Sequence, residues 1–233
     1  MIILDKKQLI TGCIFFVMLM LAWYWSLFVV TTEEHQGDVY RIIYLHVPSV
    51  FTAFLSAFIL LCMSILGLWK KSYKSVQVGL ASAEVGLLFT FLGLATGSIW
   101  GKPTWGTWWT WDARLTTTFI LALLYCGYIL LWNSVQSNLM RIKVCSVLGI
   151  MIAANIPIIY KSVTWWRTLH QPPSIFRRGG SSMSPEILSL LLINIAIMLA
   201  IGIWLIIQRY KNITLGEDLE EESYLQIRQQ EGG

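Results

Sequence analysis

Long apolar stretches separated by short polar segments dominate this chain of 233 residues. A helix that crosses a bilayer needs about 17–25 mostly apolar residues, and six stretches have this length. They run approximately over Leu9–Val30, His46–Trp69, Val76–Trp100, Thr116–Asn133, Val144–Tyr160 and Pro185–Ile207. Because they take up most of the chain, the pattern predicts an all-α integral membrane bundle of six transmembrane helices.

The composition supports this prediction. Hydrophobic residues make up 56% of the chain and charged residues 13%, whereas a soluble domain carries about 25% charged residues. The chain therefore has about half the charge that a water-exposed surface requires. The first stretch follows Lys6 and Lys7 as a signal peptide would, but it is too long for a signal-peptide core. No small-residue cleavage site follows it, so we expect a retained first helix.

The distribution of positive charge predicts how the bundle is oriented. Six spans place both termini on the same side of the membrane. With the termini in the cytoplasm, 10 of the 17 Lys and Arg residues lie in cytoplasmic segments, as the positive-inside rule favours. We therefore expect a transmembrane domain over residues 1–208 and an acidic, poorly ordered cytoplasmic tail over residues 209–233.

The arginines depart from this asymmetry, because five of the eight lie in the predicted outer segments. Arg pairs with carboxylates and phosphates through a planar fork of donors. The outer arginines therefore either contact lipid headgroups or mark a site for an anionic ligand.

Another ionisable residue, Glu84, lies within the third apolar stretch. It is expected either to meet a polar partner inside the bundle or to reach the cytoplasmic interface.

The segment between the third and fourth stretches is rich in tryptophan. Five of the 12 tryptophans lie between positions 100 and 111. Tryptophan is common at membrane interfaces, but a belt needs only one or two per helix end. In a helix, four residues of this segment would share one face at spacings i, i+3, i+4 and i+7, namely Trp105, Trp108, Trp109 and Asp112. We therefore expect a rigid aromatic platform with a carboxylate at its edge.

Such a platform suits a large, flat, apolar ligand, because indole rings supply stacking area at little conformational cost. Haem is the natural candidate, since its two carboxylates would also suit the outer arginines. Its iron commonly binds neutral histidine. All three histidines fall on the predicted outer side: His46 begins the second stretch, His170 follows a Trp pair in the last outer loop, and His35 lies among acids, where we expect it to be solvated.

The stretch from Trp105 to Thr116 resembles the WWD motif of the haem-handling proteins of cytochrome c biogenesis, and across its six stretches the chain resembles the CcmC family. The resemblance implies that His46 and His170 are the axial ligands of a haem b. The expected floor of the site is formed by Trp105, Trp108, Trp109, Trp111 and Asp112. Arg114 or Arg167 is expected to pair with the propionates.

The resemblance also implies the setting. The protein would lie in the bacterial inner membrane, or its mitochondrial equivalent, with the haem site facing the periplasm. It would present haem to the chaperone CcmE as a subunit of an ABC-type complex with CcmA, CcmB and CcmD. The chain has no phosphate-binding loop, so we expect no enzymatic activity and no catalytic residue of its own. Nucleic acid is not an expected partner.

Two alternatives remain open at this stage. A membrane cytochrome for electron transfer would place paired histidines within its spans, and its haem would be reduced by quinol. A permease for a small solute would need a polar pathway, for which the sequence offers only Glu84, Asn155 and Pro157.

Overall fold

The six predicted spans are present as helices in a computed structural model, which describes residues 5–171, 174–175 and 180–231. The helices are α1 (Lys6–Tyr24), α2 (Ile43–Lys70), α3 (Tyr73–Trp105), α4 (Ala113–Ser134), α5 (Asn138–Trp165) and α6 (Pro185–Glu231). A π-helical turn, η1 (Trp25–Val29), extends α1, and a 3₁₀ helix, η2 (Asp38–Ile42), leads into α2. All six are long and apolar enough to cross a membrane, and the described residues form no β-strand. The predicted all-α class is confirmed.

Local sequence explains where the helices begin and end. A side-chain oxygen at the N-terminus of a helix can accept a hydrogen bond from a backbone N–H that has no partner within the helix. Five helices use this cap, provided by Asp5, Ser72, Asp112, Ser137 and Ser184. The end of α3 depends on Gly106, whose φ of 78° is left-handed. Glycine adopts this conformation without a steric penalty, so the helix ends there.

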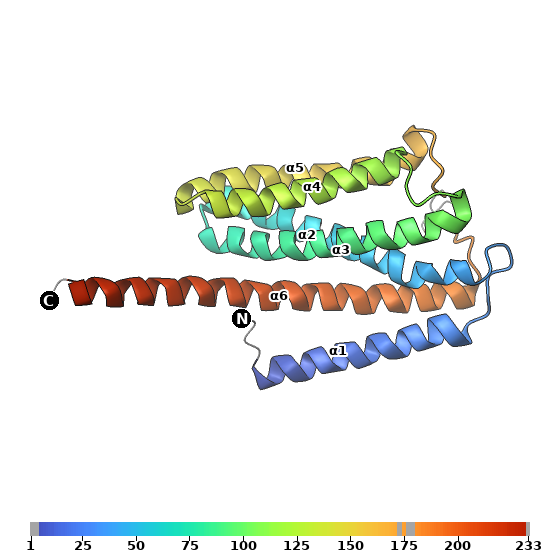
Figure 1. Cartoon of the computed structure of the whole chain (residues 1–233), viewed down its shortest axis with the longest axis horizontal. Coiled ribbons are helices and arrows are strands. Elements are labelled where there is room, and N and C mark those ends of the chain that lie inside the picture. The colour runs from blue at the N-terminus through green and yellow to red at the C-terminus, as the bar shows by residue number, and fades with distance from the viewer. Residues whose placement is uncertain (1–4, 172–173, 176–179, 232–233) are drawn as a thin grey trace.

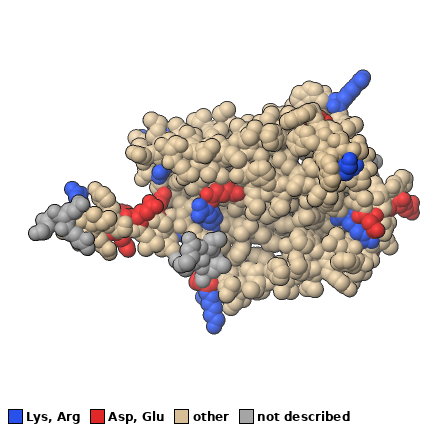
Figure 2. All heavy atoms as spheres, viewed as in Figure 1, with Lys and Arg blue, Asp and Glu red and all other residues tan. Residues whose placement is uncertain are grey.

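The two ends of the bundle differ in their connections (Figure 1). The turns 71–72 and 135–137 lie at one end, which we call the short-loop end. The segments 30–42 and 106–112 and the described residues of 166–184 lie at the other, the long-loop end. Helices α2 to α5 pack together, α6 runs alongside them, and α1 lies on the outside of α6. In Figure 2, charged side chains gather towards the two ends, and a broad uncharged surface separates them.

At the short-loop end the bundle is filled by tyrosine rings from α4. A Cβ atom added at Gly86 would lie 2.5 Å from the ring of Tyr125, and one added at Gly79 would lie 2.8 Å from the hydroxyl of Tyr128. Both tyrosines are fully buried. The glycines of α3 therefore let α4 approach closely, as small residues commonly do between membrane helices.

Helix α6 continues well beyond the bundle at the short-loop end (Figure 1). We predicted a poorly ordered tail from residue 209, and this prediction is wrong, because α6 is helical to Glu231. Contacts with α3 fasten the beginning of the extension. Arg209 donates two hydrogen bonds to Glu84, and Glu217 accepts one from Tyr73 and one from Gln77, both at 2.7 Å. Glu84 therefore has its polar partner on α6, in a partly exposed ion pair.

Candidate functional site

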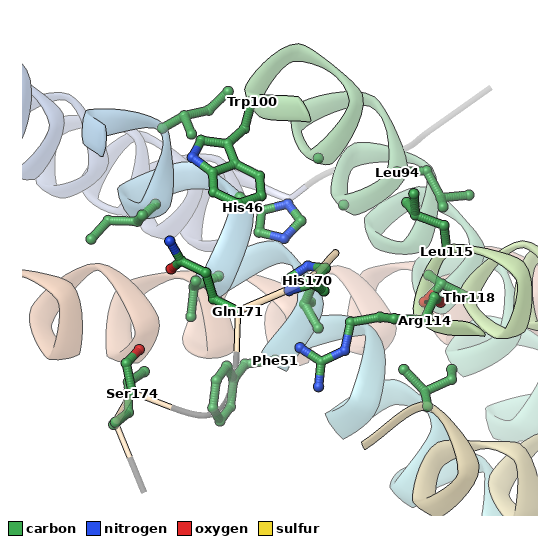
Figure 3. Close-up of a pocket in the computed structure, with 18 of the residues that line it drawn as sticks. His46, Phe51, Leu94, Trp100, Arg114, Leu115, Thr118, His170, Gln171 and Ser174 are labelled. Carbon is green, nitrogen blue, oxygen red and sulfur yellow. Dashed lines mark hydrogen bonds between the residues drawn. The ribbon is translucent and has the colours of Figure 1, made fainter. Parts of the chain in front are cut away.

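A cavity of about 290 Å³ lies at the long-loop end, between α2, α3, α4, α5 and the segment that leads into α6. This volume is near the lower end of the range of about 300–1,000 Å³ that is typical of ligand sites. Much of the wall is apolar. Its polar and aromatic side chains include Trp105. Those labelled in Figure 3 include His46, Trp100, Arg114, His170 and Gln171.

Two histidines from distant parts of the chain meet in this cavity (Figure 3). The ring centroids of His46, in the first turn of α2, and His170, in the segment after α5, are 6.4 Å apart, and the ring planes differ by 29°. Trp100 and Trp105 lie beside His170, with ring centroids 6.0 and 5.9 Å from it. The end of α3 therefore surrounds the histidine pair with indole rings.

The ring of His46 is fixed by two neighbours on α3. Its Nδ1 lies 3.0 Å from the hydroxyl oxygen of Thr96, and that hydroxyl lies 2.6 Å from the carbonyl of Leu92. Because a hydroxyl has one proton, which Thr96 donates to Leu92, its oxygen accepts from Nδ1–H. The Nε2 lone pair is then free to bind a metal. On the other side, a Cβ atom at Gly97 would lie 3.1 Å from Cε1 of the ring.

His170 is held in its neutral form. Burial, followed by the nearby charges of Arg114 and His46, lowers its pKa from 6.5 to about 3, although Asp112 opposes this shift. Its Nδ1 is buried and has no hydrogen-bond partner among the described residues. Neutral imidazole is the form that binds metal ions, so His170 offers an unprotonated nitrogen near neutral pH.

A chain of hydrogen bonds connects His170 to the start of α4. The backbone N–H of His170 donates to the Thr168 hydroxyl oxygen at 3.1 Å. The Thr168 hydroxyl in turn donates to Oδ2 of Asp112. The other oxygen of Asp112 accepts from the N–H of Leu115 at 2.8 Å and caps α4.

Arg114 brings a positive charge to the cavity wall from the first turn of α4 (Figure 3). One terminal nitrogen donates to the carbonyl of Tyr160 at 3.4 Å. Its Nε is buried without a hydrogen-bond partner in the described part of the chain. A guanidinium with unused donors is suited to a carboxylate.

The predicted helical face of tryptophans is wrong. Helix α3 ends at Trp105, and α4 begins only at Ala113, so residues 106–112 are not helical and the i, i+3, i+4, i+7 spacing does not apply. The physical cause is the glycine at position 106, which ends α3, together with Asp112, which caps α4.

The expected site residues divide into two groups. The structure brings His46, His170, Trp105 and Arg114 together around the cavity. The others do not line it, namely Trp108, Trp109, Trp111, Asp112 and Arg167. Trp109 and Trp111 pack edge-on against Phe119 of α4. Trp108 and Trp111 are 58% and 73% exposed, and Arg167 is exposed as well.

Sequence reasoning missed four residues of the site: Thr96, Trp100, Thr168 and Gln171. Trp100 was counted in the Trp-rich segment but received no role. A threonine two residues before a histidine, as at Thr168, is a local signal, because its hydroxyl can accept from that backbone N–H. Thr96 carries no such signal, because it is 50 residues from its partner His46.

The histidine pair alone would be an incomplete metal site. Among the described residues, no group of three or more His, Cys, Asp or Glu side chains could hold a metal ion. A metal bound between these two rings must therefore bring further ligands of its own. Haem iron does so, because the porphyrin nitrogens surround it and leave the axial positions to the protein.

These features define a multi-pass membrane protein with a tryptophan-lined, two-histidine cavity at one end of its bundle. The sequence profile described as "CcmC: Heme exporter protein C" matches residues 3–224. The chain therefore belongs to the haem exporter protein C family.

Three relatives illustrate the similarity. The chain is 44% identical over 165 residues to the Heme exporter protein C of Bradyrhizobium diazoefficiens. The aligned residues make up 69% of this chain and 61% of that protein. It is 38% identical over 200 residues to the Heme exporter protein C of Escherichia coli K12, and the aligned residues make up 85% of this chain and 80% of that protein. It is also 38% identical over 201 residues to a putative cytochrome c biosynthesis ccmC-like mitochondrial protein of Marchantia polymorpha, which covers 86% and 85%.

Proposed function

We propose that this protein binds haem b in the cavity at the long-loop end and presents it to the chaperone CcmE during the maturation of c-type cytochromes. It would act as a membrane subunit of an ABC-type complex with CcmA, CcmB and CcmD, and the ATPase activity would come from CcmA. The observation that carries the proposal is the pairing of His46 with His170 in a member of this family.

The geometry supports haem as the cargo. Imidazole nitrogens bind first-row metals at about 2.0–2.1 Å. The ring centroids of His46 and His170 are 6.4 Å apart, about as far apart as those of two imidazole rings whose nitrogens face one ion. Arg114 would pair with a propionate, while Trp100 and Trp105 would border the macrocycle. A cavity of about 290 Å³ would leave part of the haem uncovered, which suits a protein that passes its cargo on.

The distribution of charge supports an orientation. The short-loop end carries basic residues in and next to its two turns, namely Lys70, Lys71, Lys74, Arg141 and Lys143. The positive-inside rule places such an end in the cytoplasm. The cavity would then face the periplasm in a bacterial inner membrane. The exposed Trp108 and Trp111 would lie outside the cavity at the surface that the chaperone approaches.

The test is an absorption spectrum of the detergent-purified protein loaded with haem, compared with the spectra of His46→Ala and His170→Ala. Wild type is expected to give a six-coordinate, low-spin spectrum that each substitution converts to a high-spin one. His35→Ala is the matched control, because His35 is 85% exposed and pairs only with Glu33 in the described structure. Identical spectra for the three histidine variants would reject the two-ligand site.

A second measurement separates cargo handling from electron transfer. Loaded protein is mixed with haem-free CcmE, and the haem absorbance of the two separated proteins is followed. Movement of haem to CcmE supports the proposal. Haem that stays bound and is reduced by quinol would instead identify a membrane cytochrome.

A further inference from the structure

We infer that Asp112 and Thr168 are positioning residues, which together hold His170 in the cavity without touching the ligand themselves. This inference rests on the proposed haem site, and it concerns how one of the two axial ligands is fixed. We call the two contacts through Thr168, from Asp112 and to the His170 backbone, the Asp112–Thr168 clasp.

The carboxylate of Asp112 is fully engaged away from the cavity. One oxygen caps α4 through Leu115, and the other accepts from Thr168. Asp112 is not part of the cavity wall. Each of its oxygens is therefore held by a group of the protein, although its charge also acts on the neighbouring Arg114. The position of Asp112 ties two segments together that are 56 residues apart.

Thr168 links the carboxylate to the histidine through a single hydroxyl group. A hydroxyl can donate one hydrogen bond and accept others, and this one donates to Asp112 and accepts from the His170 N–H. The bond to Asp112 is charge-assisted, and such bonds are about twice as strong as neutral ones. The backbone of His170 is therefore tied to the rigid N-terminus of α4.

The segment around His170 has few other attachments. It leaves α5 after Trp165, and those of its residues that the structure describes form no helix before α6 begins at Pro185. Trp166, Arg167 and Leu169 are all exposed, whereas Thr168 and His170 are partly buried. The inward-facing residues of this stretch are thus the two that the clasp connects. Without it, the backbone of His170 would lose its connection to the bundle next to the ligand.

The experiment uses the full-length purified protein with Thr168→Val, Asp112→Asn and the double variant. Valine keeps the shape of threonine but lacks the hydroxyl, and asparagine keeps a good helix cap but lacks the charge. Thr168→Ser, which keeps the hydroxyl, is the conservative rescue. Thr164→Val is the matched control, because that hydroxyl bonds only to Lys161 in its own helix.

Two readouts are needed. Hydrogen–deuterium exchange of peptides covering residues 166–171 is measured in the haem-free protein, so it does not depend on haem. The share of high-spin haem, and its return to low spin on adding imidazole, is measured in the loaded protein. Thr168→Val is expected to raise both the exchange rate and the high-spin fraction about tenfold, the size of effect from losing a hydrogen bond to a charged group.

The pair of substitutions tests whether the two residues act through one contact. If they do, the double variant is no worse than the more severe single variant, because the contact can be lost only once. Additive effects, or exchange that is unchanged in Thr168→Val, would overturn the clasp. So would equal effects of Thr164→Val.

The outcomes also separate the clasp from the proposed function. Faster exchange in Thr168→Val, in a protein whose wild type binds no haem, would support the clasp and reject the haem site. A six-coordinate wild type that is unaffected by Thr168→Val in both measurements would keep the haem site and reject the clasp.

Discussion

The two ends of the bundle use the same helix for different purposes. At the short-loop end, Gly79 and Gly86 of α3 receive the rings of Tyr128 and Tyr125, and the interior is filled. At the long-loop end, Gly97 of the same helix faces the ring of His46, beside a cavity of about 290 Å³. A glycine stripe therefore does not by itself specify close packing. The residue that faces each glycine decides whether the space is filled or borders the cavity.

The polar and charged side chains also differ between the two ends. Near the short-loop end, Glu84 and Glu217 are each paired with side chains of the bundle. At the long-loop end, Nε of Arg114 and Nδ1 of His170 are buried without partners in the described residues. Buried polar groups normally have partners. Arg114 and His170 both line the cavity, so a ligand bound there would meet both residues. The hydroxyls of Ser64, Tyr128 and Ser146, near the short-loop end, are also buried without partners in the described residues, but they do not line this cavity.

The largest effect is expected from the substitution of Thr96, which lies behind His46 at the long-loop end. If its hydroxyl fixes the His46 tautomer, Thr96→Val should lower haem affinity about 10–100-fold, as changes behind a metal ligand typically do. The measurement is a haem titration followed by absorbance. Thr90→Val is the matched control on the same helix, because the Thr90 hydroxyl bonds only to Gly86 of its own helix. Equal losses in the two variants would contradict the assignment.

At the short-loop end, a substitution is expected to lower stability and to leave haem binding unchanged. Gly86→Ala places a Cβ atom 2.5 Å from the ring of Tyr125, so the free energy of unfolding should fall by about 1–3 kcal/mol. The protein that remains folded should keep the wild-type haem spectrum, because neither Gly86 nor Tyr125 lines the cavity. Denaturant unfolding in detergent, together with the absorption spectrum, checks both statements. A changed haem spectrum at unchanged stability would show that Gly86 serves the haem site and not the packing of the short-loop end.

A smaller effect is expected from the ion pair that joins α6 to α3. Glu84→Gln should lower the free energy of unfolding by less than about 1 kcal/mol. The side chain of Arg209 is 45% exposed, and its long apolar stem lets the charged group reach water. Thermal unfolding measures the loss, and limited proteolysis shows whether the extension of α6 has loosened. A loss several times larger would show that the pair is shielded from water.

The smallest expected effect is that of pH on haem binding. The pKa of His170 is lowered to about 3, so protons compete for its nitrogen only well below the ordinary value of 6.5. Haem affinity should therefore stay constant as the pH falls from about 7.5 to 5.

In the haem-free protein, the unfolded state binds more protons at His170 than the folded state between pH 6.5 and 3. The contribution of His170 to stability is therefore lost as the pH falls through that interval. A fall in affinity with a midpoint near 6.5 that disappears in His170→Ala would show an accessible ring.

Much of the fold follows from the sequence, and less of the site does. The six helices could be predicted because each needs only enough apolar residues to cross a bilayer. The histidine pair could be suspected because both residues fall on the same predicted side of the membrane as the tryptophan-rich segment, and His170 also follows a Trp pair. The tryptophan face could not be placed correctly, because the spacing argument assumed a helix through residues 106–112. The turn signal at Gly106 was present in the sequence and outweighs the apolar periodicity.

The tail illustrates a different limit. Its acidic composition suggested disorder, whereas the order of its first turns depends on contacts with distant residues. Glu217 meets Tyr73 and Gln77, which are more than 130 residues away in sequence. The His46–Thr96 and Asp112–Thr168 contacts share this property. Composition and spacing describe neighbours along the chain, so contacts between separate helices are available only from the folded structure.

The length of α6 has a mechanical consequence. At about 1.5 Å per residue, its 47 residues form a rod of about 70 Å, longer than the full thickness of a bilayer with its headgroups, about 40–45 Å. One end begins at Pro185, two residues after Met183 in the cavity wall, and the other projects past the short-loop end. An uninterrupted helix is stiff along its axis. A force applied to the projecting end of α6 would therefore be transmitted along the helix to its other end, next to the segment that carries His170.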